Sequence, residues 1–516
     1  MNKIILSLIA LLFFVPTEAQ KASTAQVDLD VNNVRTTITN NGSLFWNLIS
    51  AKFEVPKVTD PNGIRKHTIF SSSLWIAGKN NNTNHVMATL YHQNGLDIIA
   101  GPIANSYDSS HYARWDKIWK ITAEEIDLFR KNPTSNLTTG IINWPAHGDA
   151  SKGEAIMQAP FVDTDKDGVY NPTKGDYPKI KGDVCIFTVM NDDVPHTESG
   201  GKKMTLEIQQ MAYAWSTSDD LNNTIFIEYK IYNRSQNTYD SFTVSNFVDY
   251  DLGNYADDYI GTDVKRNMVY AYNGDDNDEG ILGYGLNPPA QGCMLLNKPI
   301  WNSNFFLNNF TKVGNPTKPQ HFINYIMGKN MDGSSQYNTF TNKNTPFSYD
   351  GDPCNKTGWW EGYDNNTPGD RRIMAAIAPQ TFAPGDFVEV KYAYIYARKT
   401  FGGSNGAVCE LKKVADSVLK QYLRFTGEYA VGIKERFSPI DFELFPNPLN
   451  DKLNILSSAN FQNYDYEIIS VDGKTIMKGK LVSNEISTNN ISNGLYILRI
   501  YNGEKSVHQK FIKVAE

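Results

Sequence analysis

A mainly β protein is the fold class that the sequence predicts: a β-sandwich-type body with a few short helices, plus a C-terminal immunoglobulin-like β-sandwich. The first observation is composition, because aromatic residues make up 12% of the chain, charged residues only 20%, and Asn, Gly, Tyr and Thr are plentiful. The second is a succession of short alternating segments separated by Asn, Asp, Ser and Gly turns. With 516 residues, 41% of them hydrophobic, the chain is long enough for several packed cores.

Residues 1–19 have the three parts of a secretory signal peptide. Lys3 precedes an apolar run from Ile4 to Val15, and small or polar residues follow up to Ala19. The run is about a dozen residues long, whereas a membrane-spanning helix needs about twenty. We therefore expect Sec export and cleavage before Gln20. No later segment approaches spanning length, so the mature protein is not expected to span a membrane.

The body, residues 20–431, is expected to be β-rich, either as one unit or as two subdomains. Residues 27–46 alternate well enough for two strands with a turn at Asn40-Asn41-Gly42. Further strand candidates have the same alternation and cover 68–78, 85–91, 184–190, 205–215, 224–232, 241–248 and 387–397.

Two helices interrupt this β pattern. Thr122 and Glu125 have the spacing of a capping box and precede apolar residues, which predicts a helix over 122–131. Apolar residues at helical spacing from Leu411 to Leu423 predict a second helix that packs on the body.

The pattern weakens over 432–441, which we interpret as a linker, and changes character from Phe442 onward. Short strands around 453–455, 466–470, 494–498 and 510–513 predict a small immunoglobulin-like sandwich without helices.

Four motifs in residues 442–516 carry a resemblance to a known family. They are FPNP (445–448), VDGK (471–474), NGLYIL (493–498) and KFIK (510–513). In this order they resemble the type A C-terminal sorting domain of cargo for the type IX secretion system of Bacteroidota. The resemblance implies recognition by the outer-membrane translocon, removal of the tail by a surface sortase, and an extracellular or outer-membrane location after passage through the periplasm. An ordinary immunoglobulin-like binding module is the alternative.

The body also resembles a class of secreted Bacteroidota proteins without an established enzymatic activity. The stretches that match include HTIFSSSLWIAG (67–78), DYDLGNYADDYIGTD (249–263), NPPAQG (287–292) and GDRR (369–372). This resemblance implies secretion and β architecture, and it supplies no substrate.

Residues 163–178, reading DTDKDGVYNPTKGDYP, give the chain its clearest site chemistry. In a calcium loop, side chains at positions 1, 3 and 5 converge on one ion, and Gly at position 6 permits the sharp turn around it. These places are filled by Asp163, Asp165, Asp167 and Gly168. Position 7 offers the carbonyl of Val169.

The loop departs from an EF-hand at position 12, where Lys174 stands in place of the bidentate Glu. Asp176 is the natural substitute ligand, and the prolines at 172 and 178 exclude an ordinary following helix. We expect a structural calcium loop between strands, with Asp163, Asp165, Asp167, Val169 and Asp176 as ligands. Magnesium fits less well because it keeps its waters. A solvated Asp/Gly turn that binds no ion is the alternative.

A second acidic group follows the strand that we expect to end at Val248. Its members are Asp249, Asp251, Asp257 and Asp258. It is a weaker candidate for a cation site or for a carboxylate-lined cleft, because no fixed ligand spacing is met. Acidic turns at one end of a sandwich are the alternative interpretation.

Catalysis has no recognisable signature in the sequence. Gly402 to Gly406 matches the G-x-S-x-G nucleophile elbow, but the one His after Ser404 lies in the tail, and the surrounding pattern lacks βα units. Carboxylate pairs for glycoside hydrolysis are conceivable among Glu154, Glu207, Glu228 and Glu361, with Trp359 and Trp360 as a sugar platform. Spacing alone does not identify an acid and a base.

Charge and cysteine usage narrow the partners further. The net charge of −7 without a basic tract argues against a nucleic-acid partner. The four cysteines have no zinc spacing, and both disulfides and buried thiols are open possibilities. We therefore expect an exported, calcium-stabilised and non-enzymatic protein with a role in adhesion or surface interaction and a glycan or surface ligand. The alternative is a glycan-active or other hydrolytic enzyme that uses an acidic cleft.

Overall fold

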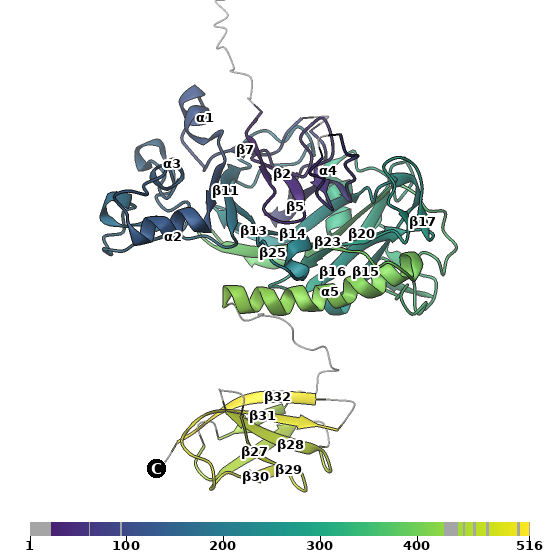
Figure 1. Ribbon diagram of the computed structural model, residues 1–516. Helices are drawn as coiled ribbons and strands as arrows, with labels where there is room; N and C mark the ends of the chain where they lie inside the picture. Colours follow the sequence, from purple (N-terminus) through teal and green to yellow (C-terminus); the bar gives the residue numbers. More distant parts are fainter. Residues whose placement is uncertain are drawn as a thin grey trace, which may run out of the picture. The chain divides into compact units, whose positions relative to one another are not determined.

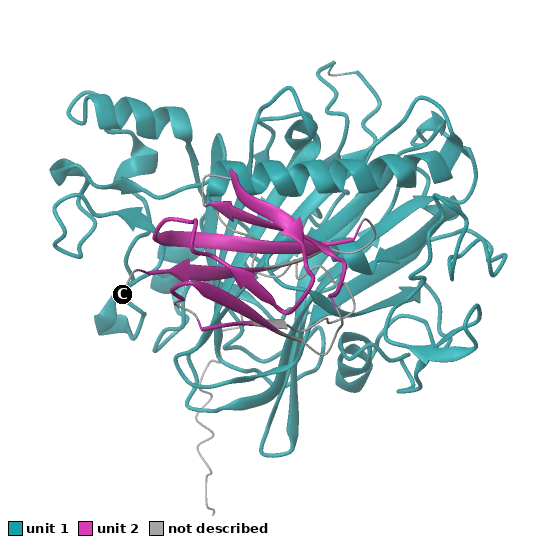
Figure 2. Cartoon of the chain, turned by 90° about the horizontal axis from the view of Figure 1, so that it is seen from below, with its two compact units in different colours: residues 1–432 teal, residues 433–516 magenta. Residues whose placement is uncertain are grey.

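The computed structural model describes residues 22–60, 62–92, 95–427, 442–446, 449–457, 461–470, 474–502 and 506–514. The chain divides into two compact units, residues 1–432 and 433–516, which Figure 2 distinguishes by colour. The predicted signal peptide (1–19) and linker (432–441) lie outside the described residues.

The first large sheet of the body has ten strands, and its pairs are antiparallel. Its main path is β1 (Gln26–Leu29), β2 (Arg35–Thr39), β3 (Ser43–Leu44), β5 (Ile69–Asn80), β14 (Tyr239–Tyr250), β23 (Arg371–Ile377) and β20 (Ile300–Leu307). Shorter strands pair beside this path: β4 (Phe53–Glu54), β6 (Thr83–Ala88) and β24 (Gln380–Phe382).

The second large sheet has nine strands, again antiparallel. Its path is β15 (Asp258–Asp263), β16 (Met268–Asn273), β19 (Ala290–Leu295), β25 (Phe387–Ala397), β13 (Thr224–Asn233), β12 (Leu206–Ala214), β11 (Val184–Asn191) and β7 (Ile99–Ala100), with β8 (Trp119–Thr122) beside β11. Three two-stranded ladders complete the body: β9 (Phe161–Val162) with β10 (Tyr177–Pro178), β17 (Asn277–Asp278) with β18 (Gly285–Leu286), and β21 (Gln336–Asn338) with β22 (Lys343–Thr345).

The two large sheets pack face to face, and their inward side chains form one core. The hydroxyl of Tyr394 on β25 shows this packing, because it accepts a hydrogen bond from Asn246 Nδ2 on β14 at 2.9 Å and lies 2.8 Å from Ser72 Oγ on β5. Its ring meets Phe45 edge to face at 4.8 Å. The mainly β body and its sandwich arrangement are therefore as predicted.

Helices cover the outer faces of both sheets. The long helix α5 (Gly403–Thr426) packs on the nine-stranded sheet, and Figure 1 shows it running across these strands. α4 (Pro319–Ile326) covers the outer face of the ten-stranded sheet through Phe322, Tyr325 and Ile326. The remaining helices are α1 (Ser109–Trp115), α2 (Ala123–Lys131) and α3 (Thr139–Ile142), with single 3-10 turns at Ala150–Lys152, Pro172–Lys174, Asp220–Asn223, Tyr255–Asp257 and Val264–Arg266.

The capping-box prediction is confirmed, whereas the second helix is longer than predicted. Thr122 and Glu125 cap α2 reciprocally. α5 has 24 residues and begins directly after Gly402, whose φ of +97° stops the preceding strand path. Its first turn has no apolar periodicity, which is why the pattern predicted only 411–423. Ser404 lies in that turn and is 3% exposed, so it does not project as a nucleophile elbow would.

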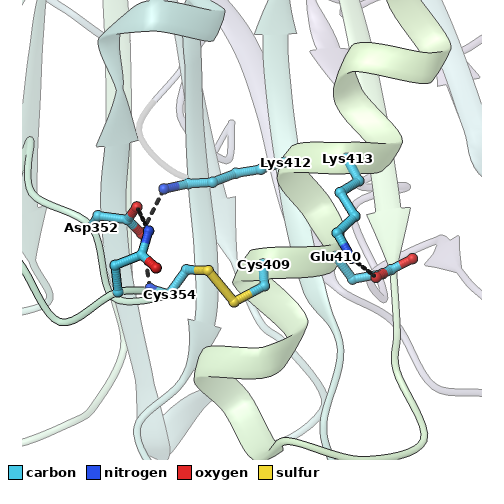
Figure 3. Close-up of a disulfide and its surroundings, with 7 residues drawn as sticks. Asp352, Cys354, Cys409, Glu410, Lys412 and Lys413 are labelled. Atoms are coloured by element: carbon cyan, nitrogen blue, oxygen red, sulfur yellow. Dashed lines mark hydrogen bonds and ion pairs between the residues drawn. A yellow bond between two sulfur atoms is a disulfide. The ribbon is translucent and has the colours of Figure 1, made fainter.

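A disulfide joins α5 to the loop before β23. Cys354 and Cys409 are 55 residues apart in sequence, and Figure 3 shows their bond beside the ion pair of Lys412 with Asp352, whose Nζ and Oδ1 lie 2.6 Å apart. The other two cysteines, Cys185 and Cys293, are buried in β11 and β19 without a disulfide.

The C-terminal unit consists of two small antiparallel sheets without a helix among its described residues, as predicted. One sheet contains β26 (Phe442–Phe445), β27 (Lys452–Ser457) and β30 (Glu485–Ser487). The other contains β29 (Thr475–Lys480), β28 (Asp465–Ser470), β31 (Gly494–Tyr501) and β32 (Ser506–Lys513). Leu453, Ile468, Leu498 and Phe511 from both sheets share one core.

Candidate functional site

The aspartate loop lies between two short strands. β9 pairs with β10 through Val162 opposite Tyr177, so the residues that follow and precede them begin close together. Gly168 and Gly175 have φ values of +78° and +100°, which a side chain would strain. The segment with Pro172 forms only one 3-10 turn. The chain therefore folds back on itself between residues 163 and 176.

Three of the predicted ligands come together in this loop. Asp163, Asp165 and Asp176 each offer a carboxylate oxygen, and these atoms lie within 4.8 Å of one another. Asp176 is buried, whereas Asp165 is exposed. Such oxygens fit the ligand chemistry of calcium.

Asp167, the third residue of the motif, is directed toward Lys174 instead. Lys174 Nζ lies 2.6 Å from Asp167 Oδ2 and 3.0 Å from Asp165 Oδ2. The hydrogen bond to Asp167 is the main reason that the pKa of Lys174 is raised, and the same bond lowers the pKa of Asp167. The residue at position 12 is thus a counter-ion of the loop, a partnership that sequence spacing did not reveal.

Backbone amides also neutralise the loop carboxylates. Asp163 accepts hydrogen bonds from the N–H groups of Lys166 (2.7 Å) and Gly168 (2.8 Å). Asp176 accepts them from Thr164 (2.7 Å) and Asn171 (2.9 Å). Val169 donates its N–H to Asp167 Oδ1 at 2.8 Å, and its side chain is 56% exposed. The loop is therefore held by its own donors as well as by Lys174.

A cleft of 880 Å³ lies beside the aspartate loop, at the end of the body where Figure 1 shows α1, α2 and α3. Its lining includes three tryptophans, Trp115, Trp119 and Trp144. The loop supports its wall directly, because Tyr170 donates its N–H to Nε2 of the lining residue His147 at 2.8 Å, and Trp144 Nε1 donates to the Pro160 carbonyl at 2.9 Å. The sequence analysis did not single out this cleft, whose residues come from separate loops.

The cleft combines an aromatic surface with cations. Trp115 and Trp144 are buried, whereas Trp119 is half-buried and meets Trp115 edge to face at 5.8 Å. Lys117 and Lys120 on the lining are exposed. An aromatic face with polar groups around it suits ring-shaped polar ligands.

The carboxylate of the cleft floor is fully engaged. Glu154 is buried and accepts hydrogen bonds from Arg114, from Trp115 Nε1 at 3.1 Å and from the Asp149 N–H at 2.8 Å. The pKa of Asp149, on the rim, is lowered chiefly by a hydrogen bond from Ser151. Neither group is arranged as a general acid with a raised pKa.

The glutamates considered for hydrolysis each pair with a basic residue. The pairs are Glu154–Arg114, Glu207–Arg234, Glu228–Lys181 and Glu361–Arg371. Trp359 is buried and donates Nε1–H to Asp364 at 2.8 Å, which leaves no open ring face there for a sugar. The side chains that sequence reasoning grouped as a possible acid, base and platform are therefore structural supports.

The second acidic group forms a different cluster from the predicted one. Asp249 and Asp251 lie together with Asp370, and one carboxylate oxygen of each is within 4.8 Å of the others. Asp370 belongs to the GDRR stretch, far from the others in sequence. Asp257 and Asp258 are outside this trio: Asp257 ends a 3-10 turn, and Asp258 begins β15 and accepts a hydrogen bond from the Leu252 N–H at 2.9 Å.

Burial dominates the electrostatics of this group. It raises the pKa of Asp249 and of Asp258 well above the usual range of aspartate, and it raises the pKa of Asp257 to about 6. Arg372 opposes the effect at Asp249, with Nε 3.3 Å from Oδ1, and pairs with Asp370 at 2.7 Å. Asp251 Oδ2 lies 3.7 Å from His67 Nε2.

Comparison with protein families identifies the tail. Residues 443–514 match the family described as "Secretion system C-terminal sorting domain". The chain is therefore a type IX secretion cargo that is exported to the cell surface or secreted, and its tail interacts with that machinery. The resemblance of the body to a secreted class is untested by these matches and stays a prediction.

Solved structures resemble the chain only distantly. One is a polysaccharide lyase, with a TM-score of 0.19, 11% identity, and coverage of 60% of this chain and 34% of that one. Another is a biofilm-associated protein BSP domain, with a TM-score of 0.13, 9% identity, and coverage of 64% and 60%. The chain thus spans well under two thirds of both proteins, and neither likeness identifies a function. The search of curated proteins found no match. In the described part of the chain, no helix has the length and apolarity to cross a membrane.

Proposed function

We propose that the exported body is a non-catalytic surface-interaction protein that binds saccharides in the tryptophan cleft and is stabilised by calcium in the aspartate loop. Sec export would precede passage through the periplasm, and a surface sortase would remove the tail. The mature body would then act in adhesion at the outer-membrane surface or in the medium.

One observation carries the binding proposal: a half-buried tryptophan stands in an 880 Å³ cleft whose buried carboxylate is already neutralised. Sugar rings stack on aromatic faces, and the exposed Lys117 and Asn143 nearby offer hydrogen bonds. Hydrolysis would need two carboxylates, one of them with a raised pKa, poised at the ligand. The engaged state of Glu154 therefore favours binding over the hydrolytic alternative.

The calcium proposal rests on the grouping of Asp163, Asp165 and Asp176. A calcium ion there would replace the ammonium of Lys174 at Asp165 and hold both ends of the loop. Because the loop supports His147 and Trp144, its order would also preserve the shape of the cleft wall. This links the proposed metal to the proposed binding surface.

The test is binding of the full chain to a panel of soluble and insoluble polysaccharides, followed by Trp119→Ala. We expect retention on at least one polysaccharide and a loss of about tenfold in affinity in the variant, in line with one stacked aromatic ring. Trp301→Ala is the matched control, since Trp301 is 39% exposed on β20 of the other sheet. Equal retention of both variants would reject the cleft as the contact surface.

Calorimetry addresses the metal separately. Titration of the chelator-treated chain with calcium should release or absorb heat and raise the melting temperature. Absence of both effects would reject calcium without affecting the saccharide assay.

A further inference from the structure

Asp249, Asp251 and Asp370 meet because of the strand register. Asp249 pairs with Arg372 and Tyr250 with Arg371 across β14 and β23. One step beyond this antiparallel ladder, Asp251 stands opposite Asp370. Side chains alternate between the faces of a sheet, so these three aspartates and Arg372 share one face.

That face is the outer one of the ten-stranded sheet. Asp249 Oδ2 accepts a hydrogen bond from the Tyr91 hydroxyl at 2.6 Å, and the Tyr91 ring contacts Phe247, which belongs to the outer core beneath α4. The carboxylates therefore lie outside the sandwich core, at the end of two adjacent strands.

The charges in this group do not balance. Three carboxylates face one guanidinium, which leaves a net charge of about −2 when all three aspartates are ionised and His67 is neutral. A buried group with this excess is costly unless a proton or a cation compensates it. One divalent cation would bring the sum to zero.

Unpaired buried oxygens point to the same gap. Asp249 is 1% exposed, and its Oδ1 accepts no hydrogen bond within the described part of the chain, because the nearby Arg372 Nε–H is donated to the Tyr91 hydroxyl at 2.7 Å. The neighbouring Asp258 is 0% exposed, and its Oδ1 has no donor either among the described residues. Buried carboxylate oxygens normally find a partner, and a metal ion is one.

We propose that Asp249, Asp251 and Asp370 form a binding site for a calcium-sized divalent cation at the end of β14 and β23. Oxygens within 4.8 Å of one another can all touch one ion at a ligand distance of about 2.4 Å, whereas the roughly 2.1 Å of magnesium requires them to lie closer. The cation ties the end of β14 to the start of β23 and to the turn that follows Asp251. The site is independent of the aspartate loop and of the saccharide proposal.

The experiment measures calcium bound per full-length chain by equilibrium dialysis after treatment with chelator. Asp370→Asn and Asp251→Asn should each remove one ion per chain or weaken its binding at least tenfold. Asp332→Asn is the control, because Asp332 is an exposed aspartate that hydrogen-bonds only its own turn at Ser334. The double variant Asp163→Asn, Asp165→Asn should affect a different ion and leave this one bound.

Amide hydrogen exchange of the unaltered chain provides a readout that needs no variant. Calcium should slow exchange at residues 249–252 and 370–372, separately from any effect at 163–176. Unchanged exchange there, or full calcium binding by both Asp370→Asn and Asp251→Asn, would overturn the proposal. Equal affinity for magnesium would overturn the assignment of ion size.

Discussion

The two acidic groups of the body solve the same repulsion in opposite surroundings. In the aspartate loop, an exposed lysine and several backbone amides approach the carboxylates. In the group around Asp249, burial removes water, and Arg372 alone pairs with Asp249 and Asp370 among the described residues. Charges near the surface interact weakly because water and salt screen them, whereas buried charges do not have that relief. The group without a recognisable motif is therefore the one that depends more on a counter-charge.

The largest effect is expected from Arg372→Met. Both partners of the Arg372–Asp249 pair are almost fully buried, and breaking such a pair leaves an uncompensated buried charge. In the presence of chelator, the free energy of unfolding should fall by about 3 kcal/mol, measured by urea denaturation. Calcium should recover more stability in this variant than in the wild type.

Arg130→Met is the matched control for that substitution. Arg130 pairs with Asp127 at the surface of α2, where both side chains are more than half exposed. Its removal should cost less than about 0.5 kcal/mol. If the two variants were equally stable, the contrast between buried and exposed groups would be wrong.

Opposite pH dependences are expected from the two groups. Burial raises the pKa of Asp257 to about 6, from an ordinary value of 3.8, so the stability that this carboxyl adds is fully present below pH 3.8 and is lost as pH rises through about 6. The pKa of Asp167 is lowered by Lys174, so its contribution is present above pH 3.8 and is lost as pH falls below that value.

Melting temperatures of Asp257→Asn and Asp167→Asn, each compared with wild type in chelator between pH 3 and 8, measure the two effects. The wild-type advantage over Asp257→Asn should shrink by about 1 kcal/mol as pH rises, because this side chain is only partly shielded from water. The advantage over Asp167→Asn should be smaller and should shrink as pH falls. Equal signs for the two variants would contradict the assignment of burial to one group and pairing to the other.

Local patterns predicted the parts of this fold that depend on local physics. Alternation identified β5, β11–β14 and β25, and the capping box identified α2, because each signal lies within one element. The strands β15, β16, β19, β20 and β23 escaped notice since they are short or buried on both faces, so they lack a clear alternation. The tail was recognised from motifs whose order matters more than their physics.

The sites divide in the same way. Spacing brought attention to Asp163 and Asp165, which lie in one short loop. Asp370 joins Asp249 only through the register of two strands more than one hundred residues apart, and no local pattern carries that register. The cleft tryptophans likewise come from α1, β8 and the segment after α3. Such sites follow from topology, which the sequence determines only through the whole fold.

The smallest effect is expected from Lys174→Met in the aspartate loop. The ammonium of Lys174 occupies the position beside Asp165 and Asp167 that a calcium ion would need, so ion binding must displace it. An exposed pair of this kind contributes at most about 1 kcal/mol, so removing the competitor should tighten calcium binding by about fivefold, with little change in stability. Lys166→Met is the matched control, since Lys166 lies in the same loop and its substitution changes the net charge equally. If both variants tightened binding to the same extent, general charge rather than the position of Lys174 would set the affinity, and the loop would resemble the buried group more than its exposure suggests.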